Sequence, residues 1–206
     1  MKKGIRILLQ IILLVVTLIF VYFTVVLIIN SVYNYSPENT RLKVKKDRSL
    51  PDTLLESTYS VISWNIGYGG LSKYADFFYD GGKMTYPTKE NYQATFSGIL
   101  DQVQAFDSIN FLLLQEVDSS SKRSYHTDQF SQIGNKIHHH GTFIKNYSVP
   151  FIPIPPLKPL SGIESGLATF STYNPSMAEQ FVFNGSFSWP MRLFMPDRCF
   201  LSNKFL

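Results

Sequence analysis

One apolar run near the N-terminus limits how this chain can fold more than any other feature. From Ile7 to Ile29 the sequence has no charged residue, and its only strongly polar side chains are Gln10, Thr17 and Thr24. At about 1.5 Å per residue, this run forms a helix of roughly 34 Å, enough to cross a hydrocarbon core of about 30 Å. We therefore predict that residues 1–30 form a transmembrane anchor and that the remaining chain folds separately.

A cleaved signal peptide is the alternative interpretation of this run. The run is longer than the apolar core of an ordinary signal peptide. The residues that follow it, Asn30 to Tyr35, are bulky and aromatic, and they contain no small-x-small cleavage motif. An uncleaved single-pass anchor is therefore favoured over a removed leader.

Basic residues flank both ends of the run. Lys2, Lys3 and Arg6 adjoin it directly, whereas the five basic residues of segment 41–48 begin about a dozen residues beyond it. The positive-inside rule then favours an N-terminus inside and a domain outside.

Eight of the 19 Lys and Arg residues are these flanking ones, so residues 49–206 hold 11 basic and 13 acidic residues and carry a net charge of −2. The positive charge therefore suits anionic headgroups near the anchor, and no basic face for nucleic acid is expected.

The rest of the chain has the composition of one folded domain. A hydrophobic content of 45% and a single cysteine exclude a disordered tail and a disulfide-rich scaffold. Residues 31–57 are rich in Asn, Ser, Pro and mixed charges, and they are predicted to be a juxtamembrane linker. Residues 58–206 are enough for one hydrophobic core.

A strand, a helix and a second strand are predicted at the start of this domain. Residues 58–65 are rich in β-branched and aromatic side chains and end at a glycine-rich loop. A helix is expected from Thr88, which can cap it, with apolar side chains at spacings of three and four up to Phe106. Residues 109–114 form a continuous apolar run typical of a buried parallel strand.

A right-handed crossover between two parallel strands brings their carboxyl ends to one edge of the sheet, where ligands commonly bind. The first strand ends in Asn65 and the second in the sequence Gln115-Glu116-Val117-Asp118. An amide and carboxylates are therefore expected to meet there.

Further along, a helix is predicted at 128–137, an extended segment at 138–147, an irregular proline-rich loop from 150 to 159, and strands at 166–172, 179–183 and 199–205. The fold class is α/β or α+β with a mixed sheet.

These segments resemble the endonuclease/exonuclease/phosphatase superfamily, which includes DNase I-like nucleases and neutral sphingomyelinases. The run from Val61 to Gly67 looks like the first strand of the family with its asparagine, and the run from Phe111 to Asp118 looks like the strand with its metal-binding glutamate. The run from Ser165 to Ser171 resembles a later glycine-led strand. Together they span the predicted domain at 58–206, which would be part of a DNase I-like four-layered α/β sandwich.

The resemblance implies hydrolysis of a phosphodiester or phosphomonoester with Mg²⁺, or alternatively Mn²⁺. By resemblance, Glu116 is a metal ligand, and Asn65 lines the phosphate and metal site beside it. Both are then catalytic residues. This agrees with the preference of Mg²⁺ for oxygen ligands and with the ability of an amide to donate to a phosphoryl oxygen.

The later motifs of the family do not occur in this chain. No Asp-x-Asn follows Gly166, and the last histidine is His140. We therefore expect the domain to be incomplete at its C-terminus and the chain to be the N-terminal part of a longer enzyme, inactive alone. The anchor and the slightly acidic domain favour a lipid headgroup or small phosphoester as substrate, with nucleic acid second. A non-catalytic, membrane-tethered binding module on the same fold is the alternative function.

Several other residues receive a structural interpretation. The consecutive His138, His139 and His140 are not expected to converge on one metal ion, because neighbouring residues of an extended segment face opposite ways, and a solvated loop is favoured. Trp189 and Phe194 are expected to pack under the sheet rather than face lipid. Cys199 is predicted to be a small buried apolar residue.

Overall fold

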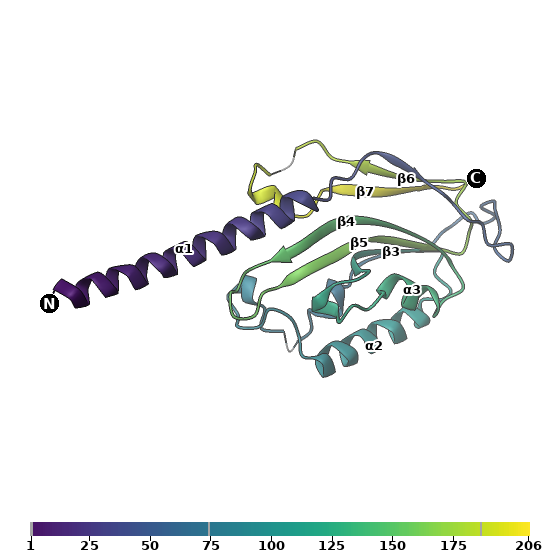
Figure 1. Cartoon of the computed structure of the whole chain (residues 1–206). Helices are drawn as coiled ribbons and strands as arrows, with labels where there is room; N and C mark the ends of the chain where they lie inside the picture. The colour runs from purple at the N-terminus through teal and green to yellow at the C-terminus, as the bar shows by residue number, and fades with distance from the viewer. Residues whose placement is uncertain (1, 74, 186) are drawn as a thin grey trace.

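The computed structural model describes residues 2–73, 75–185 and 187–206, and it consists of one long N-terminal helix followed by a mixed α/β domain (Figure 1). The α-helices are α1 (Lys2–Val32), α2 (Lys89–Ala105) and α3 (Gln129–Gly134). The strands are β1 (Thr40–Leu42), β2 (Val61–Asn65), β3 (Phe111–Asp118), β4 (His140–Ile152), β5 (Ser161–Ser171), β6 (Met177–Val182) and β7 (Cys199–Lys204).

The strands form two sheets. One has the order β2-β3-β5-β4, with β2 and β3 parallel and the other neighbours antiparallel. The second has the order β1-β6-β7 and is antiparallel throughout. The predicted parallel strand, helix, strand unit is therefore confirmed. Its helix begins as expected, because the Thr88 side chain accepts a hydrogen bond from the Asn91 N–H and caps α2.

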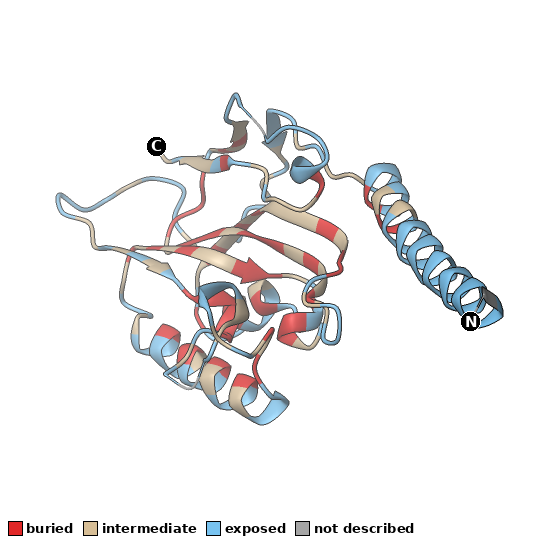
Figure 2. Ribbon diagram, turned by 90° about the vertical axis from the view of Figure 1, so that its left-hand side faces the viewer, coloured by how far each residue is buried: buried red, intermediate tan, exposed pale blue. Residues whose placement is uncertain are grey.

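The main core lies between the four-stranded sheet and the two helices that cover one face of it (Figure 1). Helix α2 contributes Tyr92, Phe96, Ile99 and Val103 at helical spacing. The alternating residues Leu112 and Leu114 of β3 meet them from the sheet. Burial is concentrated in this layer (Figure 2).

The second sheet packs against the opposite face of the four-stranded sheet, which gives three layers in the described part of the chain (Figure 1). The Thr142 hydroxyl of β4 donates to Asn203 Oδ1 of β7 at 3.0 Å and joins the two sheets. The fit is incomplete near β2, where an open groove of about 430 Å³ separates Val61 and Phe111 from Phe200. The mixed α/β class is thus established, and the four-layered sandwich stays a prediction.

The segment expected to be a juxtamembrane linker, residues 31–57, is instead part of the folded domain. Strand β1 pairs with β6, which closes one edge of the second sheet. Farther on, the Asn174 side chain donates to the Asp47 and Leu50 carbonyls and fixes this segment to the end of the domain. The sequence pattern missed this because the pairing is long-range and β1 has only three residues.

The three consecutive histidines diverge, as expected. His138 Nε2 lies 3.1 Å from Ser49 Oγ, His139 Nε2 lies 2.8 Å from the Ile109 carbonyl, and His140 Nε2 lies 3.1 Å from the Lys45 carbonyl. The prediction of a solvated loop was wrong for His139 and His140, because the side chain of His139 is 1% exposed and His140 is buried at the start of β4. Cys199 is buried as predicted, whereas Trp189 is exposed rather than packed under the sheet.

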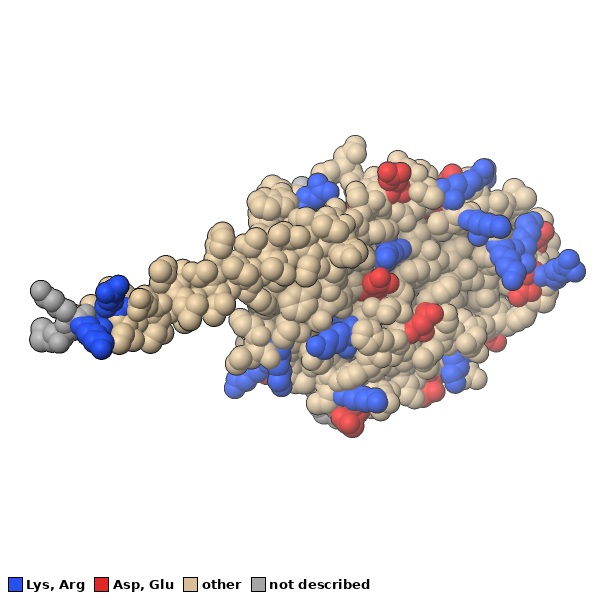
Figure 3. All heavy atoms as spheres, in the orientation of Figure 1, with Lys and Arg blue, Asp and Glu red and all other residues tan. Residues whose placement is uncertain are grey.

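Helix α1 is long and apolar enough to cross a membrane, a test that a signal sequence also passes. Most of it is exposed, and its charged side chains lie at its free N-terminal end (Figures 2 and 3). The other end is docked on the domain. Val26 is 4% exposed and Asn30 is 1% exposed. Asn30 Nδ2 donates to the Phe151 carbonyl at 2.9 Å, and the Phe151 N–H donates to Asn30 Oδ1 at 3.4 Å. The last turns of α1 therefore belong to the folded domain.

Candidate functional site

The two residues expected to form the site, Asn65 and Glu116, are brought together at the carboxyl ends of β2 and β3. The strand register sets Asn65 opposite Gln115, next to Glu116. Asn65 Nδ2 donates to Glu116 Oε1 at 2.9 Å, and Asn65 Oδ1 accepts the Gly67 N–H at 2.9 Å. Both atoms of the amide group are therefore engaged, and they fix the orientation of the carboxylate.

The backbone at Glu116 is unusual. The register between β3 and β5 shifts between Gln115 and Val117, and the intervening Glu116 has a φ of 54°. A left-handed conformation costs free energy for a residue with a Cβ, and a bulge redirects the side chain that carries it. Here the carboxylate lies at the half-buried edge of the sheet, beside the exposed Asn65. Backbone strain of this kind is concentrated at functional sites in proteins.

A buried ion pair lies beside this edge. Arg123 donates from Nε to Asp118 Oδ2 at 3.0 Å and from Nη2 to Oδ1 at 2.8 Å, and both side chains are buried. Burial opposes the charge on Arg123, but the contact with Asp118 outweighs it and raises the arginine pKa. The guanidinium lies 3.8 Å from the centre of the Tyr68 ring, and burial raises the pKa of Tyr68 to about 12. Tyr68 is therefore a neutral hydrogen-bonding group at neutral pH.

Gln129 links these residues to the helices. Its side chain accepts the Asp118 N–H at 2.8 Å and donates to the Tyr68 carbonyl at 2.7 Å. The sequence favours a loop or supporting role for Asp118 over a ligand role, and nothing in it indicates a role for Gln129. The signal available for the ion pair was an acidic residue at the end of a buried strand and a basic residue five positions later. This network holds the loop under the candidate site in one conformation.

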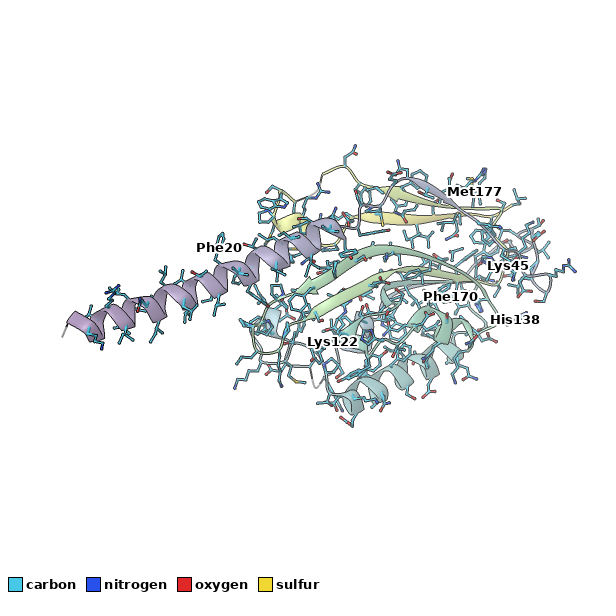
Figure 4. The ribbon with its side chains drawn as sticks, viewed as in Figure 1. Phe20, Lys45, Lys122, His138, Phe170 and Met177 are labelled. Carbon is cyan, nitrogen blue, oxygen red and sulfur yellow. The ribbon has the colours of Figure 1, made fainter. Side chains whose placement is uncertain are left out.

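The carboxyl end of β3 points toward the end of the domain that carries α1, and the pairing through β5 sets Glu116 level with Lys145, six residues before Phe151 on β4. Strand β4 ends at Ile152, one residue after the Phe151 that contacts α1, and β3 runs in the same direction because both are antiparallel to β5. Lys122, just beyond β3, is at this end, whereas Lys45 and His138 are at the opposite end (Figure 4). A cavity of about 520 Å³ opens here. It is lined by Tyr33, which directly follows α1, by Lys122 and His126, and by Glu164.

The donor set fits a magnesium site with few protein ligands. Among the described residues, no group of three or more His, Cys, Asp and Glu side chains converges. Glu116 offers a hard oxygen ligand at an accessible edge, and Mg²⁺ commonly binds through one or two carboxylates, waters and substrate phosphate. Asn65 Oδ1 is already used by Gly67, which favours a positioning role for Asn65 over a ligand role.

The chain has no match among protein families, curated proteins or solved structures. The resemblance drawn from the motifs around Asn65 and Glu116 therefore stays a prediction.

Proposed function

We propose that this chain provides the metal-binding part of a membrane-anchored, Mg²⁺-dependent phosphoesterase, with Glu116 as metal ligand and Asn65 as the residue that positions it. The observation that carries the proposal is the 2.9 Å contact between these two side chains at the carboxyl ends of two parallel strands. Ligands bind at this edge in open α/β sheets.

Each residue has a specific task in this proposal. A bound Mg²⁺ neutralises phosphate charge and polarises the phosphoryl group. Asn65 holds one oxygen of Glu116 and leaves the other available. Lys122 and His126, which line the neighbouring cavity, attract the anionic substrate. The Asp118 and Arg123 pair keeps the loop that carries them in place.

The position of the site favours a lipid headgroup as substrate. The cavity lined by Tyr33, Lys122 and His126 lies at the end of the domain that carries α1, and the carboxyl ends of β2 and β3 point toward this end, so an anchored chain turns the site toward the bilayer. A domain with a net charge of −2 does not attract the nucleic acid backbone. Nucleic acid is therefore the second choice of substrate.

The buried contacts between the end of α1 and β4 support an uncleaved anchor, because these contacts would be lost from the mature domain if a signal peptidase removed α1. Following the positive-inside rule, we propose that the N-terminus is inside and the domain outside. Labelling intact cells with an impermeant maleimide tests this orientation. A Leu55→Cys variant is expected to react, because Leu55 is 77% exposed on the domain, and a Lys3→Cys variant is not.

Metal binding by the detergent-solubilised chain tests the site. We expect Glu116→Gln to weaken Mn²⁺ or Mg²⁺ binding by at least about tenfold and Asn65→Ala by about tenfold, since residues that orient metal ligands contribute on this scale. Glu90→Gln, an exposed change of the same type on α2, serves as the control. Equal binding by all four proteins would reject the metal site.

Hydrolysis assays test the activity separately. We expect the 206-residue chain alone to be inactive on sphingomyelin, a phosphoinositide and plasmid DNA, because no group of three or more His, Cys, Asp and Glu side chains converges among the described residues. Mg²⁺-dependent hydrolysis that Glu116→Ala abolishes would contradict the expected inactivity, and cleavage of plasmid alone would reject the lipid preference.

A second candidate is a non-catalytic membrane-tethered module that binds phosphorylated headgroups. No group of three or more His, Cys, Asp and Glu side chains converges among the described residues, which favours this module. Lys122 and His126 can bind phosphate without a metal. Binding of a soluble headgroup phosphate that is unchanged by Mg²⁺ or by Glu116→Gln, but lost in Lys122→Gln, would select this module over the enzyme.

A further inference from the structure

The loop between β4 and β5 lies against the apolar part of α1. We call residues 153–157 the wedge loop. It forms a crevice of about 430 Å³ with one side of the helix. The crevice is lined by Leu18, Ile19, Tyr22, Phe23, Pro153, Ile154 and Pro156. No charged side chain is among these residues.

The depth of this contact follows from helix geometry. Arg6 is the last charged residue before the apolar run, so it sits at the headgroup level when α1 crosses a bilayer. At about 1.5 Å per residue, Leu18 and Phe23 lie roughly 18 and 26 Å from Arg6 along the helix. The hydrocarbon core is about 30 Å thick. The part of α1 that the wedge loop contacts is therefore inside the hydrocarbon, and the loop reaches the same depth.

The wedge loop has the chemistry that this position requires. Leu157 is 97% exposed and Ile154 is 47% exposed, which is unfavourable in water for two large apolar side chains. Irregular backbone is costly in lipid because its N–H and C=O groups lack partners. Three of the five residues of the loop are prolines, which have no N–H to satisfy.

Two of the carbonyl groups of the wedge loop also have hydrogen-bond partners. The Ile154 carbonyl accepts hydrogen bonds from the Leu160 N–H at 3.3 Å and the Tyr79 hydroxyl at 3.0 Å. The Pro155 carbonyl accepts the Lys158 N–H at 3.2 Å. These bonds and the missing N–H groups of the three prolines lower the cost of placing the loop in lipid.

We propose that the wedge loop inserts into the bilayer leaflet that holds the C-terminal half of α1, and that the crevice between them holds a lipid acyl chain. The exposed Lys158 follows the loop and binds anionic headgroups at the surface. The proposal rests on the membrane-spanning role of α1 in the proposed function and is independent of its metal chemistry.

Fluorescence quenching of the full chain in phosphatidylcholine vesicles tests insertion. The only native thiol, Cys199, is buried, so single variants Leu157→Cys, Leu13→Cys and Leu55→Cys can each carry one environment-sensitive fluorophore. Leu13 is 67% exposed in the middle of α1 and reports on the anchor. Leu55, on the domain, is the matched control for water exposure.

We expect a nitroxide on the lipid acyl chain to quench the probes at 157 and 13 to a similar extent, and aqueous iodide to quench only the probe at 55. Lipid quenching at 13 combined with iodide quenching at 157 would overturn the insertion of the loop while leaving the anchor intact. Iodide quenching at all three positions would overturn both the anchor and the loop insertion.

A phosphatidylcholine with a photoreactive acyl chain tests the crevice. Cross-links are expected on the peptide that contains residues 153–157, and Ile19→Trp, which fills the crevice, should reduce them. Val16→Trp, an exposed α1 position that does not line the crevice, should leave them unchanged. Cross-links that occur between two copies of the chain, or that are unaffected by Ile19→Trp, would overturn the acyl-chain assignment.

Discussion

Among single residues, the buried pair of Asp118 and Arg123 has the clearest energetic consequence. Replacing Arg123 with Met leaves a carboxylate buried without its partner, and such changes cost about 3–5 kcal/mol. The double variant Arg123→Met, Asp118→Leu removes both charges and should lose less stability than Arg123→Met. Urea-induced unfolding of the detergent-solubilised chain measures this.

The exposed pair of Lys46 and Asp52 provides the control for this comparison. These side chains are in contact at 2.7 Å, but both are about half exposed to solvent. Salt bridges at the surface contribute little, so Lys46→Met should hardly change the unfolding transition. If Lys46→Met and Arg123→Met destabilised the chain equally, burial would not be the reason for the effect.

His140 predicts a pH dependence of stability. Burial lowers its pKa from the ordinary value of 6.5, and among the described residues its buried Nδ1 has no hydrogen-bond partner. A proton on Nδ1 is therefore unfavourable in the folded state and favourable in the unfolded chain. Stability from this residue is present above pH 6.5 and is lost as the pH falls below it.

Denaturation midpoints measured from about pH 7 to 5 test this dependence. The His140→Gln variant should lose less stability on acidification than the original chain. The matched control is His126→Gln, which replaces an exposed histidine at the other end of the domain by the same residue type. A slope that stays the same in His140→Gln would reject this explanation.

The candidate site was predictable at the level of residue identity but not of geometry. The sequence indicated that Asn65 and Glu116 share one edge of the sheet, because the carboxyl ends of two parallel strands lie at the same edge. The left-handed backbone of Glu116 was not predictable, because it depends on a bulge against β5, about 50 residues away in sequence. The role of Gln129 likewise depends on tertiary contacts.

At the scale of elements, the docking of α1 on β4 depends on one polar side chain. Asn30→Leu removes the partner of both the N–H and the C=O of Phe151, at a cost of about 1–3 kcal/mol. We expect faster hydrogen exchange at the end of β4 in nanodisc-embedded protein. Thr24→Val, which removes a hydrogen bond to Phe20 on the exposed side of α1, should leave this exchange unchanged. Equal exchange in both variants would contradict the docking.

Elements with a local signal were predicted best. Helix α2 has a capping residue and a regular apolar spacing, and both appear in the structure. Strand β1 has neither, since its pairing with β6 joins residues about 140 positions apart. The proline-rich segment was correctly expected to be irregular, but only from residue 153, because β4 continues through Pro150 to Ile152.

At the scale of the whole molecule, the basic segment 41–48 lies far from α1, and this changes the interpretation of charge. The Lys45 carbonyl contacts His140 at the start of β4, while Phe151 at the other end contacts α1. Eleven strand residues at about 3.3 Å each separate these points by roughly 36 Å, several times a Debye length of about 10 Å. The basic side chains gather at the end opposite α1 (Figure 3). They therefore cannot bind the headgroups of the bilayer that α1 crosses if the domain stands on its anchor.

This orientation predicts a difference between two lysines at opposite ends of the domain (Figure 4). In vesicles with a headgroup-attached quencher, a fluorophore on Lys122→Cys should be quenched and one on Lys45→Cys should not. Raising the fraction of anionic lipid should leave the second probe unquenched, because screening removes the attraction over this distance. Quenching at residue 45 that grows with anionic lipid would mean that the domain lies flat on the membrane. Helix α1 would then have to bend, or the hydrogen bond between Asn30 and Phe151 would have to break, because this bond fixes the end of α1 to one end of β4.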